Sequence, residues 1–296
     1  MDALKTMQEV QQFEANRNKL LGIAYRITGS VSEAEDIVQE TFIRWSNADA
    51  TEIKNLDAWL CTITTRLSLD LLKSARHKRE SYLGPWLPEP LIESKHEPEA
   101  AHEIDQTVTM ALMVLLDQLS ATERASYILH DLFNYSFNDV ADILGQSVAS
   151  CRKQASRGRE KIHLEPKHSI ASVDKHQKLI SAFFKATRDA DSEALLKLLS
   201  DDIVFHADGG GKASAAQDIL TGRGEVMPWF NKVLSPAFKY FEQKNEKRSI
   251  EWFNGLPGLV LWQNGKAVSA FSFTIVDNKI RKIHALRNPD KLKFFC

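Results

Sequence analysis

A proline-rich segment in the first third of the chain sets the strongest limit on how it folds. The run Gly84-Pro85-Trp86-Leu87-Pro88-Glu89-Pro90 holds three prolines within six residues. Proline removes a backbone donor and disfavours helix in the residue before it. One continuous helical domain is therefore excluded, and residues 81–102 are predicted to form a stiff, extended linker. With 296 residues, the chain is long enough for two or three folded units around this linker.

Composition narrows the class of protein. Hydrophobic residues make up 43% of the chain and charged residues 26%, as in ordinary globular proteins. The net charge is −1, from 38 Lys and Arg against 39 Asp and Glu, so nucleic-acid binding would need local basic patches. We expect a cytoplasmic protein with no membrane segment. Cys61, Cys151 and Cys296 are scattered, which predicts reduced thiols, no disulfide and no bound metal.

Periodicity divides the chain into three folded parts. Residues 1–80 and 103–166 have apolar residues at helical spacing and are predicted to be all-α. Residues 174–296 combine two helix-like stretches with several runs of β type, which predicts an α+β domain with a curved antiparallel sheet. The helices are expected at Asp174–Ala190 and Ser192–Leu199, and the strands at Ile203–His206, Gly258–Gln263, Ala267–Val276 and Lys279–Leu286.

An amphipathic helix is predicted after residue 32. Ser32 and Glu35 have the spacing of a capping box, and the apolar positions that follow form one face: Ala34, Ile37, Val38, Thr41, Phe42 and Trp45. The opposite face carries acids, and between Glu33 and Asp57 seven acids stand against only Arg44 and Lys54. Charge alone leaves two interpretations open, a solvated face or a surface that binds a cationic partner.

The next helix has the opposite charge. It is predicted to begin near Asp57 and to bury Leu60, Ile63, Leu67 and Leu71. Between Arg66 and Glu80 there are five Lys or Arg against two acids. A basic stripe on a helix is a weak signal for phosphate contact, and a solvated face explains it equally well.

Residues 119–163 have the spacing of a helix-turn-helix. Ser120 and Glu123 form a capping box for a helix through His130, and Ser136 caps a short helix that ends at Gly145. Ser147 caps the next helix, which is predicted to direct Val148, Cys151 and Ala155 inward. The opposite side carries Ser150, Lys153 and Arg157. Basic residues exceed acids by four in 147–169, as a DNA recognition helix requires; a helical hairpin with a solvated basic end is the alternative.

The run Asp208-Gly209-Gly210-Gly211-Lys212 is a further motif. A phosphate-binding loop of the Walker type would need glycine at position 206 and Ser or Thr at 213, where His206 and Ala213 stand. We therefore interpret Asp208 and the three glycines as a turn.

These motifs together resemble a known family. The segment 35–45 is similar to region 2, and residues 119–162 to region 4, of extracytoplasmic-function (ECF) RNA polymerase sigma factors. The runs 86–90, 208–212 and 288–292 resemble three signatures of the subgroup with a fused SnoaL-like domain, the sigma factor J type. The implied fold is multidomain: an all-α region 2 bundle, an all-α region 4 helix-turn-helix, and an α+β NTF2-like cone.

The resemblance implies roles for individual residues. It places core polymerase binding on Glu35, Asp36, Gln39 and Glu40, and capture of a flipped base of the −10 element on Asn47–Asn55. It implies that the opened promoter strand is bound by Arg66, Lys73, Arg76, Lys78 and Arg79. It implies that the −35 element is bound by Ser150, Lys153 and Arg157. Relatives carry base-reading arginines where this chain has Ala149 and Cys151.

For the C-terminal domain, the resemblance implies regulation in place of an anti-sigma protein, and no cofactor. We expect Trp86, Pro88 and Glu89 of the linker to meet the turn of Asp208, Gly209, Gly210, Gly211 and Lys212, and the segment of Asn288, Pro289 and Asp290 to clasp the linker. Isomerases of this fold use Tyr and Asp at the positions of Phe183 and Ala207, which argues against an enzyme. Binding of a small apolar ligand by this domain is still compatible with the sequence. The alternative function is a one-component helix-turn-helix regulator with a metabolite-binding cone.

Overall fold

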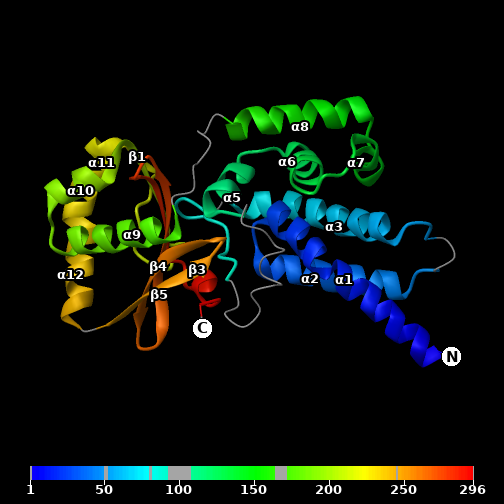
Figure 1. Ribbon diagram of the computed structural model, residues 1–296, viewed down its shortest axis with the longest axis horizontal. Helices are drawn as coiled ribbons and strands as arrows, with labels where there is room; N and C mark the ends of the chain where they lie inside the picture. Colours follow the sequence, from blue (N-terminus) through cyan, green and yellow to red (C-terminus); the bar gives the residue numbers. More distant parts are fainter. Residues whose placement is uncertain are drawn as a thin grey trace. The chain divides into compact units, whose positions relative to one another are not determined.

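The computed structural model describes residues 2–49, 53–79, 82–92, 108–163, 172–244 and 246–295, with the backbone alone for 2–9, 75–79 and 163. The chain divides into two compact units (Figure 1). The helical unit comprises Met1–Glu80, Ser94–Val108 and Leu112–Pro166, and the α+β unit comprises Ser81–Glu93, Thr109–Ala111 and Lys167–Cys296. The linker segment Ser81–Glu93 therefore belongs to the α+β unit.

Three helices form the first half of the helical unit: α1 (Asp2–Thr28), α2 (Val31–Ser46) and α3 (Leu56–Arg79). They pack against one another around Phe13, Leu20, Val38 and Leu60. The ring of Phe13 stacks on Trp45 at 5.9 Å between centroids. The predicted apolar face of α2 is confirmed, because Ala34, Ile37, Val38 and Thr41 are buried.

The predicted apolar seam of α3 is wrong in part. Leu60 is fully buried, but Ile63, Leu67 and Leu71 are only partly buried. Small hydroxyl residues take their place: Thr64, Thr65 and Ser68 are fully buried. Ser68 Oγ donates to the Thr64 carbonyl at 2.7 Å, and Thr41 Oγ1 lies 3.1 Å from Thr64 Oγ1. Because these hydroxyls find partners within the bundle, helices can approach closely without burying an unsatisfied group.

The second half of the helical unit is a series of short helices: α5 (Met110–Asp117), α6 (Ala121–Tyr127), the π-helical turn η2 (Ile128–Leu132), α7 (Phe137–Leu144) and α8 (Val148–His163). The reciprocal cap of Ser120 and Glu123 is present as predicted, but α6 gives way to the π turn after Tyr127. Helices α6 and α7 pack against α3, so both helical blocks contribute to one unit.

One buried arginine joins the two blocks. Arg124 of α6 is completely buried, and its Nε donates to the Arg26 carbonyl of α1 at 2.8 Å. Its Nη1 lies 3.1 Å from Asp117 Oδ1. An arginine in this position satisfies a helix carbonyl and a carboxylate together, which makes it a specific junction between the blocks.

The α+β unit contains a six-stranded sheet covered by helices. Its elements in order are α9 (Val173–Arg188), α10 (Ser192–Leu198), β1 (Leu199–Asp208), β2 (Leu220–Thr221), α11 (Gly222–Trp229), the π turn η3 (Phe230–Leu234), α12 (Ser235–Gln243), β3 (Lys247–Phe253), β4 (Leu256–Gln263), β5 (Lys266–Val276), β6 (Lys279–Leu286) and α13 (Pro289–Leu292). The strand order is β2-β1-β6-β5-β4-β3. The predicted multidomain fold class, all-α followed by α+β, is confirmed.

The sheet differs from the predicted one in two respects. Strands β1 and β6 pair in parallel, whereas the other neighbours are antiparallel. Strands β2 and β3 were not predicted: β2 has only two residues, and the sequence of β3, KRSIEWF, carries charges and is mostly exposed or half-buried. Strand β3 lies at the edge of the sheet, where only one neighbour constrains its composition.

The two faces of strand β1 have different surroundings. Phe205 and Ala207 point into the apolar core, which is dominated by aromatic side chains such as Phe183, Phe230, Phe238, Phe271 and Phe273. His206 and Asp208 alternate to the other face of the sheet. Both are nonetheless buried, so other segments of the chain cover that face of the sheet.

Two absences hold for the described part of the chain. No helix there is long and apolar enough to cross a membrane, and no group of three or more His, Cys, Asp or Glu could hold a metal ion. Cys61 and Cys151 are free thiols, both buried.

Candidate functional site

The acidic face of α2 is set by how the helix begins. The N-cap is Ser30, whose side chain accepts from the Glu33 backbone N–H at 3.2 Å. The predicted cap of Ser32 and Glu35 is therefore wrong. The sequence offers two overlapping pairs with the same spacing, and the earlier one is used because the helix begins at Val31. Glu35 is consequently not engaged in capping and lies exposed.

The acids predicted to bind polymerase lie together on this helix. Glu35, Asp36 and Gln39 are exposed, and Glu40 is half-exposed with an ion pair to Arg44 at 2.8 Å. Exposed pairs of this kind contribute little to stability. The inner face of the helix is anchored in the core, so the acids form a fixed anionic surface that can meet a cationic partner.

The basic residues predicted on α3 are in different situations. Arg66 is exposed, but its Nε donates to the Ile143 carbonyl at 3.3 Å, in the last turn of α7, where helix carbonyls lack intrahelical partners. Lys73 forms an exposed pair with Asp70 at 3.2 Å. Arg76, Lys78 and Arg79 lie in the final turns of α3, and their side chains are outside the described residues, as is part of the loop 47–55.

The helix-turn-helix has the predicted local structure. Ser136 and Asp139 form a reciprocal cap on α7, and Gly145 ends it with φ of 64°, in the left-handed region. Ser147 Oγ accepts from the Ser150 N–H at 3.2 Å at the start of α8. Ala155 is buried as predicted, whereas Val148 is only half-buried.

Cys151 is fully buried on the inner face of α8, and burial raises the pKa of its thiol. Position 151 therefore cannot contact a base in this structure, whereas Ala149 is exposed. Of the two positions where relatives carry arginines, only the first faces outward here.

Four basic side chains of α8 separate into two groups, while Arg152 lies over the ring of Phe137. Arg159 pairs with Asp131 at 2.5 Å, and Lys161 pairs with Glu123 at 2.8 Å. The hydrogen bond from Lys161 outweighs the opposing effect of burial and lowers the pKa of Glu123. Lys153 and Arg157 are exposed, and no acid pairs with either within the part of the chain that the structure describes. The paired group holds α8 on the unit, and the unpaired group presents charge outward.

Ser150 belongs to a side-chain network at the start of α8. Its Oγ donates to Gln146 Oε1 at 3.2 Å, and Gln154 Nε2 donates to the same oxygen at 2.8 Å. Gln154 in turn accepts from Ser126 of α6 at 3.0 Å. The network fixes the turn against α6, so Ser150 is positioned by its neighbours.

In the α+β unit, Asp208 is the centre of linker binding. Its carboxylate is completely buried. Oδ1 accepts from Tyr82 Oη at 2.6 Å, and Oδ2 accepts from the Leu87 backbone N–H at 2.9 Å. Asp208 is the last residue of β1 and not part of the turn, so its interpretation as a simple turn residue is wrong.

Lys291 of α13 completes this cluster. Its Nζ lies 2.7 Å from Asp208 Oδ2 and also donates to the Leu87 carbonyl. The ammonium sits over the rings of Trp86 and Tyr82, at 4.4 and 5.2 Å from their centroids. Burial, followed by the bond to Asp208, raises the pKa of the Tyr82 hydroxyl. We call Tyr82, Trp86, Leu87, Asp208 and Lys291 the linker clasp.

The glycine turn and Asn288 shape the surroundings of the clasp. Asn288 Nδ2 donates to Tyr82 Oη at 2.9 Å, and its Oδ1 caps the Asp290 N–H at 3.0 Å. Gly210 has φ of 58°, and a Cβ there would overlap the Asn288 amide. A Cβ on Gly211, with φ of 69°, would lie 2.8 Å from Leu83 Cδ1. These two positions therefore require glycine for the linker to lie where it does.

The other predicted residues of this region surround the clasp. Gly209 is buried, Lys212 pairs with Asp290 at 2.5 Å on the surface, and Pro289 opens α13. In the linker, Pro88 is buried and Glu89 half-buried. The linker is held a second time at Asn254, which accepts from the Leu91 N–H at 3.2 Å and donates its own N–H to the Leu91 carbonyl at 2.8 Å.

Sequence reasoning missed Tyr82, Asn254 and the central role of Lys291. Lys291 lay within a recognised motif, but nothing in the pattern indicated that its ammonium would be buried. Tyr82 and Asn254 lie outside every motif and are defined only by the folded contacts.

Positions 183 and 207, in the interior of the α+β unit, carry neither an acid nor a base. Phe183 is fully buried, with its ring 5.3 Å from that of Phe273, and Ala207 lines a cavity. His206 and Asp208 lie on the opposite face of β1 from Ala207. Neither Phe183 nor Ala207 can transfer a proton.

Both helical blocks match known protein families. Residues 12–78 match Sigma-70 region 2, and residues 109–162 match Sigma-70, region 4. A chain with both regions in this order is of the RNA polymerase sigma factor class. The acidic helix α2 lies within the segment that matches region 2. A one-component regulator would not need such a region.

Relatives extend the likeness over nearly the whole chain. It is 34% identical to the ECF RNA polymerase sigma factor SigJ of Mycobacterium tuberculosis, covering 96% of this chain and 93% of the relative. It is 27% identical to the probable ECF sigma factor SigI of the same species, covering 95% and 93%. The crystal structure of M. tuberculosis SigJ superposes with a TM-score of 0.75 at 30% identity, covering 96% of this chain and 98% of that one. The chain belongs to the ECF RNA polymerase sigma factors.

Proposed function

We propose that this sigma factor binds core RNA polymerase through the acidic face of α2 and promoter DNA through α3 and α8. The observation that carries the proposal is the division of charge on α8. Basic residues needed for packing are neutralised by Asp131 and Glu123, while Lys153 and Arg157 are left exposed. A helix that only packed would gain nothing from cations without acidic partners.

The outer face of α8 is suited to the −35 element. Lys153 and Arg157 are four residues apart, so their side chains lie on one face of the helix about one turn apart. Cations in this arrangement grip phosphates beside a groove, while short side chains at the helix start approach the bases. Ser150 and Ala149 are the short side chains there, and Ser150 is held in place by Gln146.

Contact with the opened −10 strand is assigned to Arg66, Lys73, Arg76, Lys78 and Arg79, and base capture to the loop Asn47–Asn55. The bond from Arg66 to the Ile143 carbonyl bears on this assignment. A neutral carbonyl is a weaker partner than a phosphate, so DNA can replace it. Binding of DNA by Arg66 would then remove one link between α3 and α7.

Polymerase binding by the acidic face can be tested directly. Asp36→Asn combined with Glu40→Gln removes two charges without changing side-chain size, and is expected to weaken association with core polymerase at least tenfold. Glu14→Gln on α1 is the control, since this residue is exposed and lies outside the face. Equal association of both variants would contradict the assignment.

The α+β unit is proposed to restrain the helical unit in place of an anti-sigma factor. The linker joins region 2 to region 4, and the clasp holds eleven of its residues, 82–92, on the α+β unit. The freedom of the two helical blocks to separate on polymerase therefore depends on the clasp. Truncation after Pro166 is expected to change promoter-specific transcript yield, and unchanged yield would contradict this role.

We further propose that one cavity of the α+β unit, whose walls include Phe205, Trp229 and Phe271, binds a small, mainly apolar ligand and catalyses no reaction. The cavity is lined by aromatic and aliphatic side chains, and apolar concave sites of this kind are typical of ligand binding. Phe183 and Ala207 stand where a proton-transfer enzyme would need polar groups. Turnover of a ketosteroid-type substrate by the purified chain would contradict the second half of this proposal.

A further inference from the structure

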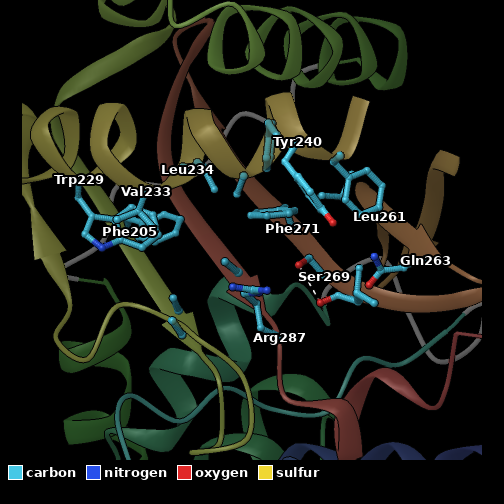
Figure 2. A pocket seen from close by; sticks show the side chains of 17 residues that line it. Phe205, Trp229, Val233, Leu234, Tyr240, Leu261, Gln263, Ser269, Phe271 and Arg287 are labelled. Atoms are coloured by element: carbon cyan, nitrogen blue, oxygen red, sulfur yellow. Dashed lines mark hydrogen bonds between the residues drawn. The ribbon is translucent and has the colours of Figure 1, made fainter. Parts of the chain in front are cut away.

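The cavity of the α+β unit has a volume of about 200 Å³. Figure 2 shows its labelled side chains around the opening, with aromatic rings of Phe205, Trp229 and Phe271 along its walls. Val233 and Tyr240 also line it and are 36% and 54% exposed. They are therefore at the mouth, where the cavity meets solvent. The walls alone would suit an uncharged apolar molecule.

Arg287 is the exception among the seventeen residues that line the cavity, because it is the only one with a charge. It directly follows β6. Its Nη1 donates to the Ser214 carbonyl, and its Nε is buried without a hydrogen-bond partner. Figure 2 shows the guanidinium at the edge of the cavity, below the ring of Phe271.

Other arginines of the same unit are paired with acids. Arg223 pairs with Asp201, Arg188 with Asp189, and Arg281, on β6 itself, with Asp202 at 2.7 Å. Throughout the residues described, no carboxylate pairs with Arg287. Burial lowers the pKa of its guanidinium, which remains charged at neutral pH. A partly buried cation without a counter-ion is costly unless a bound anion compensates it.

The shape of the cavity and this charge define a ligand class. A guanidinium presents two parallel N–H donors and fits a carboxylate, with bonds about twice as strong as neutral ones. The apolar walls fit a hydrocarbon or aryl group. The volume is below the roughly 300–1,000 Å³ of sites for drug-sized molecules, so the molecule is small.

We propose that the cavity binds a small apolar monocarboxylate, with the carboxylate on Arg287 and the hydrocarbon or aryl group against Phe205, Trp229 and Phe271. This inference rests on the proposed ligand-binding role of the cavity and adds the charge of the ligand. The backbone N–H of Arg287 donates to the Asp208 carbonyl at 2.7 Å. Arg287, the residue proposed to bind the carboxylate, is therefore hydrogen-bonded to Asp208 of the linker clasp and directly precedes Asn288.

The test compares an acid with its uncharged analogue on the full-length chain. Isothermal titration calorimetry is performed with 3-phenylpropionate and with 3-phenylpropanamide, which have the same size and the same aryl group. The acid is expected to bind at least tenfold more tightly, because only it carries a charge for Arg287. Arg287→Met, which keeps the length of the side chain, is expected to remove this difference. Arg281→Met, on the strand β6 that precedes Arg287, is the control and should retain the difference.

Three results would overturn the proposal in distinguishable ways. Equal affinity for acid and amide would remove the role of Arg287 but leave an apolar ligand site. Binding of neither compound at millimolar concentration would remove the ligand site as well. Retained preference for the acid in Arg287→Met would place the anion elsewhere. If Arg287→Met does not fold, Arg287→Lys must keep the preference for the acid, and Ala237→Trp at the exposed wall must weaken both compounds.

Discussion

Helix α8 of the helical unit and the linker clasp of the α+β unit use their charged residues in opposite ways. On α8, Lys153 and Arg157 are exposed and pair with no acid among the described residues, and exposed charges of this kind contribute little to stability. In the α+β unit, Asp208 and Lys291 are buried in a cluster that holds the linker. The first arrangement leaves charge available for a partner molecule, whereas the second uses charge to hold the chain's own linker. The same residue types thus serve recognition on α8 and internal docking in the linker clasp.

The largest expected effect comes from breaking the buried cluster. Asp208→Asn keeps the shape of the side chain but leaves the Lys291 ammonium buried without its anion, which is expected to cost about 3–5 kcal/mol. Urea denaturation of the full chain, followed by tryptophan fluorescence, measures the change in the free energy of unfolding of the α+β unit. Proteolysis within the linker segment 82–92 should increase together with this change.

Asp290→Asn is the matched control for the buried cluster. This carboxylate pairs with Lys212, but both side chains are more than half exposed, so the cost is expected to be below about 1 kcal/mol. Equal effects of the two substitutions would show that the burial of Asp208 has no special consequence.

A smaller effect is expected from the glycine turn. Gly210→Ala places a methyl group at φ of 58° and against the Asn288 amide, which is expected to cost about 1–3 kcal/mol. Gly265 has φ of 75° but no atom within 4 Å of a Cβ, so Gly265→Ala measures the backbone strain alone. The difference between the two variants reports the close approach of Asn288, and no difference would mean that the linker contact tolerates the methyl group.

Two substitutions on α8 are expected to have opposite effects on stability and on DNA binding. Lys153→Gln is expected to leave stability within about 0.5 kcal/mol and to reduce the salt slope of DNA binding by about one unit. Lys161→Gln removes the partner of Glu123 and is expected to lower stability by up to about 1 kcal/mol, with a smaller change in DNA affinity. Filter binding across a salt series and thermal denaturation measure both. If Lys153→Gln lowered stability and Lys161→Gln weakened DNA binding, the proposed division between cations that hold α8 in place and cations that bind DNA would be contradicted.

Buried His284 offers the smallest and most specific test. Burial, ahead of repulsion from His206, holds the pKa of its imidazole well below the usual value of 6.5. Its contribution to stability is therefore present above the unfolded pKa and is lost as pH falls below it. Between pH 7 and pH 5 the α+β unit should lose stability, and His284→Gln should lose less. An identical pH profile for both chains would show that this group does not titrate on unfolding.

The sequence predicted the exposed surfaces better than the buried contacts. The basic face of α8 could be read from helical period alone, because exposed side chains keep the orientation that the helix gives them. The start of α2 was predicted two residues late, since the run SVSEAE at 30–35 contains two capping pairs of equal spacing, Ser30 with Glu33 and Ser32 with Glu35. In α3, burial of Thr64 and Ser68 in place of leucines depended on hydroxyl partners that no periodicity reveals.

The linker clasp shows where sequence reasoning stops. The motifs at 86–90, 208–212 and 288–292 were recognised, but the atoms that join them were not. Tyr82 and the backbone of Leu87 hold Asp208, and Lys291 bridges both segments. These contacts join residues more than a hundred positions apart, and Arg287 and its cavity likewise depend on the closed sheet. Only the folded chain brings such groups together.

The outer face of α8 is proposed to direct polymerase to promoters. Run-off transcription with core polymerase on a genomic DNA library of the source organism tests it most directly. The full chain should give discrete promoter-specific transcripts, which Lys153→Gln combined with Arg157→Gln should largely abolish and Arg159→Gln should retain. Absence of specific transcripts with the full chain, or an unchanged set with the double variant, would contradict the account.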